Sequence, residues 1–128
     1  MKKRLYVFIA VIVLLLITPQ LFAQYDRDSV VAVMRNSYGL IGEINAAANT
    51  NDFYTTAVKL MELAEDFKTL EQTPPPRGSR AEWDRIHNEL IDAAFRGIGA
   101  CGDRDSKALK AELSKIMAYN QEGHSKFK

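Results

Sequence analysis

The sequence has few of the residues on which most small catalytic or metal-binding domains depend. Its 128 residues include one cysteine and two histidines, which excludes an internal disulfide framework and a cysteine-cluster metal site. It has no glycine-rich phosphate loop, no His-Glu-x-x-His motif and no Glu-x-x-His pair. Seventeen basic residues are balanced by sixteen acidic ones, so charge gives no reason to expect a nucleic-acid partner. We therefore expect neither an enzyme nor a nucleic-acid-binding protein.

The overall composition is that of a folded domain. Hydrophobic residues make up 47% of the chain and charged residues 26%, which excludes a disordered chain. A chain of 128 residues is long enough to bury one modest core and too short for two domains.

The amino terminus has the pattern of a secretory signal peptide. Lys2, Lys3 and Arg4 precede an apolar run over residues 5–17, and Pro19 and Ala23 follow it. A membrane anchor is the alternative, but the run covers only about 13 residues, whereas a spanning helix needs about 20. We predict that residues 1–23 are a signal peptide cleaved after Ala23. The domain of residues 24–128 would then be exported to a periplasm, with no stable membrane insertion after cleavage.

Three breaks divide the predicted mature chain into four segments. The strongest break is the proline-rich stretch at residues 73–79, whose three consecutive prolines cannot continue a helix. Weaker breaks lie at residues 49–52 and 97–105. Asn51 or Asp52 is a candidate N-cap for the second segment, and Ser79 with Glu82 fits the capping-box pattern at the start of the third.

Apolar residues recur at helical spacing in each segment, and none of the segments alternates with the period of a strand. These residues are Val30, Val33, Met34, Ile41 and Ile44; Phe53, Ala57, Leu60, Ala64, Phe67 and Leu70; Trp83, Ile86, Leu90, Ala94 and Ile98; and Leu109, Leu113, Ile116, Met117, His124 and Phe127. Four amphipathic helices with short connections predict an all-α fold, an antiparallel four-helix bundle.

Three further residues, His124, His87 and Cys101, each admit more than one role. His124 falls on the predicted apolar stripe of the last helix, where spacing alone favours a structural residue near a helix end. His87 has charged neighbours, so we expect it at the surface. Cys101 stands in a Gly-Ala-Cys-Gly stretch that we interpret as a turn. Its thiol is either a half-buried apolar group or the site of an intermolecular disulfide, which would make a homodimer possible.

The carboxyl-terminal sequence His-Ser-Lys-Phe-Lys, which begins at His124, resembles the end of proteins of the cytochrome b562/cytochrome c′ superfamily. There the histidine of this segment is a haem-iron ligand. A methionine in the first helix, a proline-rich connection after the second and an aromatic residue opening the third are also similar to that superfamily. The resemblance covers most of the predicted mature chain and again implies a four-helix bundle.

The resemblance also implies how haem would be bound. The two cysteines that attach haem covalently in cytochrome c′ fall on Asn120 and Gly123, which cannot form thioethers. The resemblance therefore implies non-covalent haem b with His124 and Met34 as axial ligands, and Tyr38 is a rival of Met34. Arg35, Lys59 and Arg104 are alternative partners for the haem propionates.

Three functions remain open at this point. The expected one is periplasmic electron transfer by haem b to an unidentified redox partner protein. A haem-free bundle acting as a periplasmic binding or interaction module is the alternative. Gas sensing at five-coordinate haem would follow if Met34 does not bind the iron.

Overall fold

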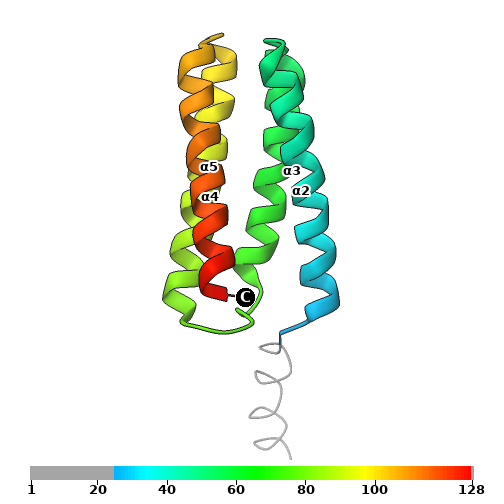
Figure 1. Cartoon of the computed structure of the whole chain (residues 1–128), viewed down its shortest axis with the longest axis vertical. Helices are drawn as coiled ribbons and strands as arrows, with labels where there is room; N and C mark the ends of the chain where they lie inside the picture. Colours follow the sequence, from blue (N-terminus) through cyan, green and yellow to red (C-terminus); the bar gives the residue numbers. More distant parts are fainter. Residues whose placement is uncertain (1–24, 128) are drawn as a thin grey trace, which may run out of the picture.

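The computed structural model describes residues 25–127, which form four antiparallel helices (Figure 1). These are α2 (Arg27–Asn49), α3 (Phe53–Gln72), α4 (Arg80–Gly102) and α5 (Ser106–Phe127). The all-α four-helix bundle predicted from the sequence is confirmed. The predicted signal peptide lies outside the described residues. No helix within residues 25–127 is long and apolar enough to cross a membrane.

Each helix begins with a side chain that accepts a hydrogen bond from a backbone amide of the first turn. These bonds join Asp26 to the Ser29 amide (3.3 Å), Asp52 to Thr55 (3.1 Å), Ser79 to Glu82 (3.0 Å) and Asp105 to Ala108 (3.0 Å). Such caps satisfy amides that have no partner within the helix. The capping box predicted at Ser79 is only half formed, because the Glu82 carboxylate binds Arg85 and Lys126 instead.

The proline-rich connection between α3 and α4 is fixed by side chains of α4. The Trp83 indole donates a hydrogen bond to the Leu70 carbonyl at 2.9 Å. The Arg80 guanidinium donates to the carbonyls of Glu71 (2.8 Å) and Thr73 (3.0 Å). These donors satisfy carbonyls at the end of α3 that lack a helical partner, so they hold the two helix ends together.

The sequence break predicted at residues 97–105 begins six residues too early, because α4 continues to Gly102. Gly97 lies inside the helix at a close contact, where an added Cβ would be 3.0 Å from Cδ1 of Leu60. Glycine there permits α3 and α4 to pack closely and does not end the helix. Cys101 is consequently in the last turn of α4 and not in a loop.

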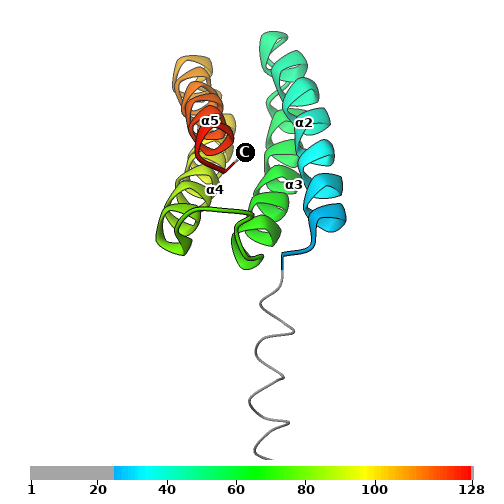
Figure 2. The same cartoon turned by 60° about the horizontal axis from the view of Figure 1, so that its bottom comes forward.

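The helices pack in sequence order. α2 packs on α3, α3 on α4 and α4 on α5, whereas α2 and α5 scarcely touch. Figure 2 shows two helical hairpins, α2/α3 and α4/α5, joined along α3 and α4. The core is therefore densest along α3 and α4, and the face between α2 and α5 is open. We call it the α2/α5 face.

Candidate functional site

An apolar cavity of about 490 Å³ lies at the end of the bundle where α2 begins and α5 ends. All four helices contribute to its walls, with apolar side chains that include Phe67, Trp83, Ile86 and Leu90. Cofactor pockets in proteins typically measure about 300–1,000 Å³ and have mostly apolar walls. The size and lining of this cavity therefore suit a cofactor-sized ligand.

The three residues singled out as iron ligands all line this cavity. Met34 enters from α2 and is half-buried. Tyr38 lies one turn further along α2 and is 80% exposed, so most of its ring faces solvent at the rim. His124 enters from the last turn of α5 and is exposed. The fold thus brings together residues far apart in the sequence, from two helices that scarcely touch.

The expectation that Met117 and His124 lie on the buried stripe of the last helix is wrong. Met117 is 48% exposed and His124 is exposed, while the buried residues of α5 are Leu109, Ile116 and Phe127. Positions 117 and 124 are seven apart and therefore share a helix face, but that face flanks the buried one. His124 is consequently at the edge of the cavity, where its imidazole is accessible to a ligand.

His87 is buried, and the expectation that it lies at the surface is also wrong. Its residue exposure is 5%, it lines the cavity, and its ring packs against Trp83 with centroids 4.3 Å apart. Desolvation by burial lowers the pKa of the imidazole, although the bond to the Trp83 carbonyl opposes this shift. The helical spacing from Trp83 to His87 to Leu90 is the sequence signal that could have identified this residue.

The hydrogen bond of His87 determines its tautomer. Nδ1 lies 2.8 Å from the Trp83 carbonyl oxygen, and a carbonyl can only accept a hydrogen bond. Nδ1 must therefore carry a proton, and in the neutral ring Nε2 carries the lone pair. His87 thus presents a neutral imidazole with an acceptor nitrogen on the wall of an apolar cavity.

A second, more polar cavity of about 780 Å³ continues along the α2/α5 face. Its lining includes Asn45, Asn49 and Lys110, and it shares Asn120 and His124 with the apolar cavity. His124 therefore stands at the junction between an apolar and a polar section of the open face.

Among the described residues, the basic side chains at these cavities differ from those suggested by the sequence. Arg27 lines the apolar cavity and Lys110 the polar one, whereas Arg35, Lys59 and Arg104 line neither. The Lys59 ammonium instead pairs with Glu43 at 3.3 Å and Glu62 at 3.5 Å.

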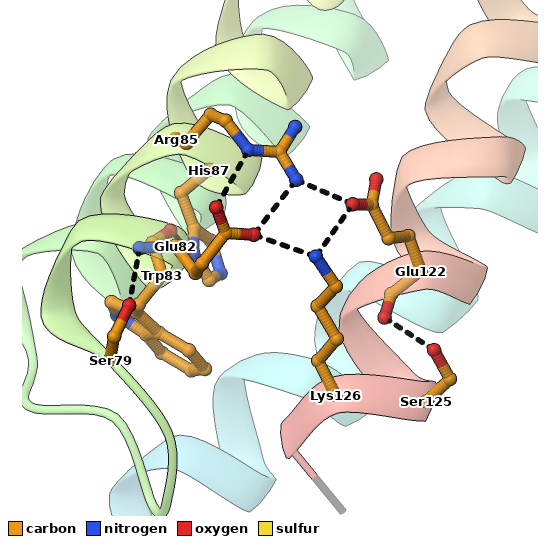
Figure 3. A network of polar contacts seen from close by, with 8 residues as sticks. All are labelled: Ser79, Glu82, Trp83, Arg85, His87, Glu122, Ser125 and Lys126. Carbon is orange, nitrogen blue, oxygen red and sulfur yellow. Dashed lines mark hydrogen bonds and ion pairs between the residues drawn. The ribbon is translucent and has the colours of Figure 1, made fainter.

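An ion-pair network joins α4 to α5 beside the cavity (Figure 3). The Arg85 guanidinium and the Lys126 ammonium each contact both Glu82 and Glu122, with Lys126 Nζ 2.6 Å from Glu82 and 3.1 Å from Glu122. Hydrogen bonds from Arg85 and then Lys126 lower the pKa of Glu82 to about 2. The network orients the last turns of α5, the part of that helix that carries His124.

Cys101 is 4% exposed, and burial raises the pKa of its thiol. Cys101 is therefore not in the turn that the sequence suggested, and its burial favours an apolar role over that of an accessible thiol.

Within the described residues, no group of three or more His, Cys, Asp or Glu side chains could hold a metal ion.

The site combines a thioether, two imidazoles and apolar walls in one cavity that opens on the α2/α5 face. Such an arrangement can bind an apolar molecule and supply neutral nitrogen and sulfur donors to it. Comparisons of the chain with protein-family models, curated proteins and solved structures gave no match.

Proposed function

We propose that this chain binds haem b non-covalently in the apolar cavity and transfers electrons in the periplasm. The resemblance of its carboxyl-terminal segment to the cytochrome b562/cytochrome c′ superfamily supports this proposal. The observation that carries it is the meeting of Met34 from α2 and His124 from α5 in one apolar cavity.

The residues present fit a haem group. The His124 imidazole and the Met34 thioether are neutral axial donors, and Phe67, Leu70 and Phe127 are among the apolar walls that would exclude water from the porphyrin. Arg27 is a basic residue of the same lining and would pair with a haem carboxylate. Haem bound through one imidazole and one thioether supplies low-spin, one-electron chemistry at a raised potential. Asn120 and Gly123 line the cavity beside His124, and neither can form a covalent bond to haem.

Titration with hemin tests the proposal directly. Hemin should bind stoichiometrically and raise the melting temperature, because a ligand that binds only the folded state stabilises it by mass action. His124→Ala should lose most of the binding. Met34→Ala should retain haem and lose the thioether signature of the reduced spectrum. If hemin changes neither the absorption spectrum nor the melting temperature, the proposal is wrong.

A second experiment tests where the haem lies. The double variant Asn120→Cys, Gly123→Cys places a Cys-x-x-Cys-His motif at His124, the pattern of c-type haem attachment. A Cβ at Gly123 would be 3.6 Å from Cγ2 of Ile86, an ordinary contact. Produced together with a c-type maturation system, this variant should retain haem in acidified acetone, whereas the unmodified protein should release all of it. The same variant carrying His124→Ala is the control and should attach much less haem.

The alternative function is a haem-free periplasmic binding or interaction module. The observation that favours it is the length of the open α2/α5 face, where the polar cavity extends the apolar one. If the α2/α5 face binds some other ligand and not haem, added hemin should change neither the absorption spectrum nor the melting temperature. If instead hemin binds and the unmodified protein is already high-spin in both oxidation states, the five-coordinate form suited to gas sensing is favoured.

A further inference from the structure

His87 is a buried polar residue of the cavity that neither axial position of the proposed haem site uses. It lies on α4 with the Trp83 ring against it, in a wall that is otherwise mainly apolar. A buried polar group is unfavourable unless it finds a partner. Nδ1 has such a partner in the Trp83 carbonyl at 2.8 Å. Among the described residues, no protein group forms a hydrogen bond with Nε2, which is therefore free to bind an occupant of the cavity.

The chemistry of Nε2 restricts that occupant. Because Nδ1 carries the proton, Nε2 can accept a hydrogen bond or donate its lone pair to a metal ion, but it cannot donate to a carboxylate. Metal-binding histidines commonly donate their other ring N–H to a backbone carbonyl, which fixes the ring and increases the basicity of the ligating nitrogen. The Trp83 carbonyl is such a partner, and the Trp83 ring restricts the rotation of the imidazole.

We propose that His87 is a further iron ligand of this site, and that in the ferric protein its Nε2, not the Met34 sulfur, would bind the iron together with His124. The proposal rests on the haem-binding function proposed above. Imidazole nitrogen suits iron in both oxidation states, whereas thioether sulfur is a soft donor that favours lower oxidation states. The cavity therefore offers two donors of different softness from α4 and α2, and the Met34 thioether competes best when the iron is ferrous.

A pair of matched variants separates the two donors. Met34→Leu and His87→Leu each replace one donor by an apolar side chain. Both variants, loaded with hemin, are compared with the unmodified protein by electron paramagnetic resonance and near-infrared magnetic circular dichroism. In the ferric state we expect a low-spin bis-imidazole signal in the unmodified protein and in Met34→Leu. His87→Leu should lose this signal and gain the thioether-to-iron charge-transfer band or a high-spin signal.

Asn88→Leu is the control, because Asn88 is the exposed neighbour on the same helix and should alter no spectrum. A high-spin ferric signal in Met34→Leu together with an unchanged spectrum in His87→Leu would overturn the role of His87 and leave haem binding intact. Failure of the unmodified protein to bind hemin would instead overturn the haem proposal and, with it, this one.

A measurement without haem tests the premise. Nitrogen-15 chemical shifts of His87 in the ligand-free protein should show a protonated Nδ1 and an unprotonated Nε2. The opposite tautomer would overturn the proposal, because Nε2 would then have no lone pair to offer. Circular dichroism of His87→Leu establishes that the helices are retained, so that a lost signal reports ligation and not unfolding.

Discussion

At the scale of single residues, burial of His87 links folding to pH. Its pKa is lowered from 6.5, first by desolvation and against the opposing effects of the Trp83 carbonyl, Glu71 and Asp84, while Arg80 acts in the same direction as burial. Well above pH 6.5 the imidazole is neutral in both the folded and the unfolded chain, and it adds no pH dependence. As the pH falls below that value, the unfolded chain binds a proton that the folded protein does not, so the folded protein loses stability.

We therefore expect the melting temperature of the ligand-free protein to fall as the pH is lowered from 7 to 5. His87→Leu should remove most of that slope. The carboxylates of Glu82 and Glu122, with their lowered pKa values, contribute in a more acidic range. Calorimetry across this interval checks the prediction, and equal slopes for the unmodified protein and His87→Leu would contradict it.

Cys101 gives a second prediction at this scale. Because the thiol is buried and its pKa is raised, it should react with an alkylating reagent in the folded protein far more slowly than in denaturant. Cys101→Ser would bury a hydroxyl in an apolar environment and should cost about 1–3 kcal/mol of stability. Mass spectrometry after timed alkylation measures the first effect. Rapid formation of a disulfide-linked dimer under native conditions would show that the thiol is accessible.

At the scale of the helices, two glycines that look alike in the sequence have opposite consequences. Gly42 in α2 has nothing within 4 Å of an added Cβ, whereas at Gly97 in α4 that atom would be 3.0 Å from Leu60. Gly42→Ala should stabilise the protein by up to about 1 kcal/mol through helix propensity. Gly97→Val should destabilise it by about 1–3 kcal/mol through overpacking. Chemical denaturation measures the free energy of unfolding of both variants. A stabilising effect of Gly97→Val would show that α3 and α4 can move apart at no cost in free energy.

The sequence predicted the number of helices and most of their starts, because N-caps and apolar spacing are local signals. It misplaced the end of α4, since a glycine that permits close packing looks the same as one that ends a helix. It misjudged His87 because the polar neighbours at 85, 88 and 89 obscured the spacing from Trp83. The sequence also could not show that His124 lies outside the buried stripe of α5. Two adjacent faces of that helix carry apolar residues, and the packing against α4 determines which of them is buried.

At the scale of the whole molecule, the separation of α2 from α5 could not be predicted. Helical periodicity identifies which face of a helix is apolar, but it does not determine how closely two non-consecutive helices approach. The cavity depends on that distance. The sequence could therefore suggest Met34 and His124 as residues of a site, but not the cavity that they share, nor Arg27 at its wall.

Because the four helices are packed unequally, we expect their backbone amides to be protected unequally against hydrogen exchange. α3 and α4 each pack on two neighbours, whereas α2 and α5 each pack mainly on one. Amide hydrogens of α2 and α5 should therefore exchange faster than those of α3 and α4 in the ligand-free protein. Hemin should slow exchange mostly in α2 and α5. Hydrogen exchange followed by mass spectrometry checks both expectations, and uniform protection by hemin would contradict binding at the α2/α5 face.

The open face also has a kinetic consequence. A ligand can enter a closed four-helix bundle only when the bundle unfolds locally, so its association rate is limited by the rate of that opening. Here the cavity already opens between α2 and α5. Capture should therefore proceed at nearly the same rate in variants of different stability, and differences in affinity among them should appear as differences in residence time.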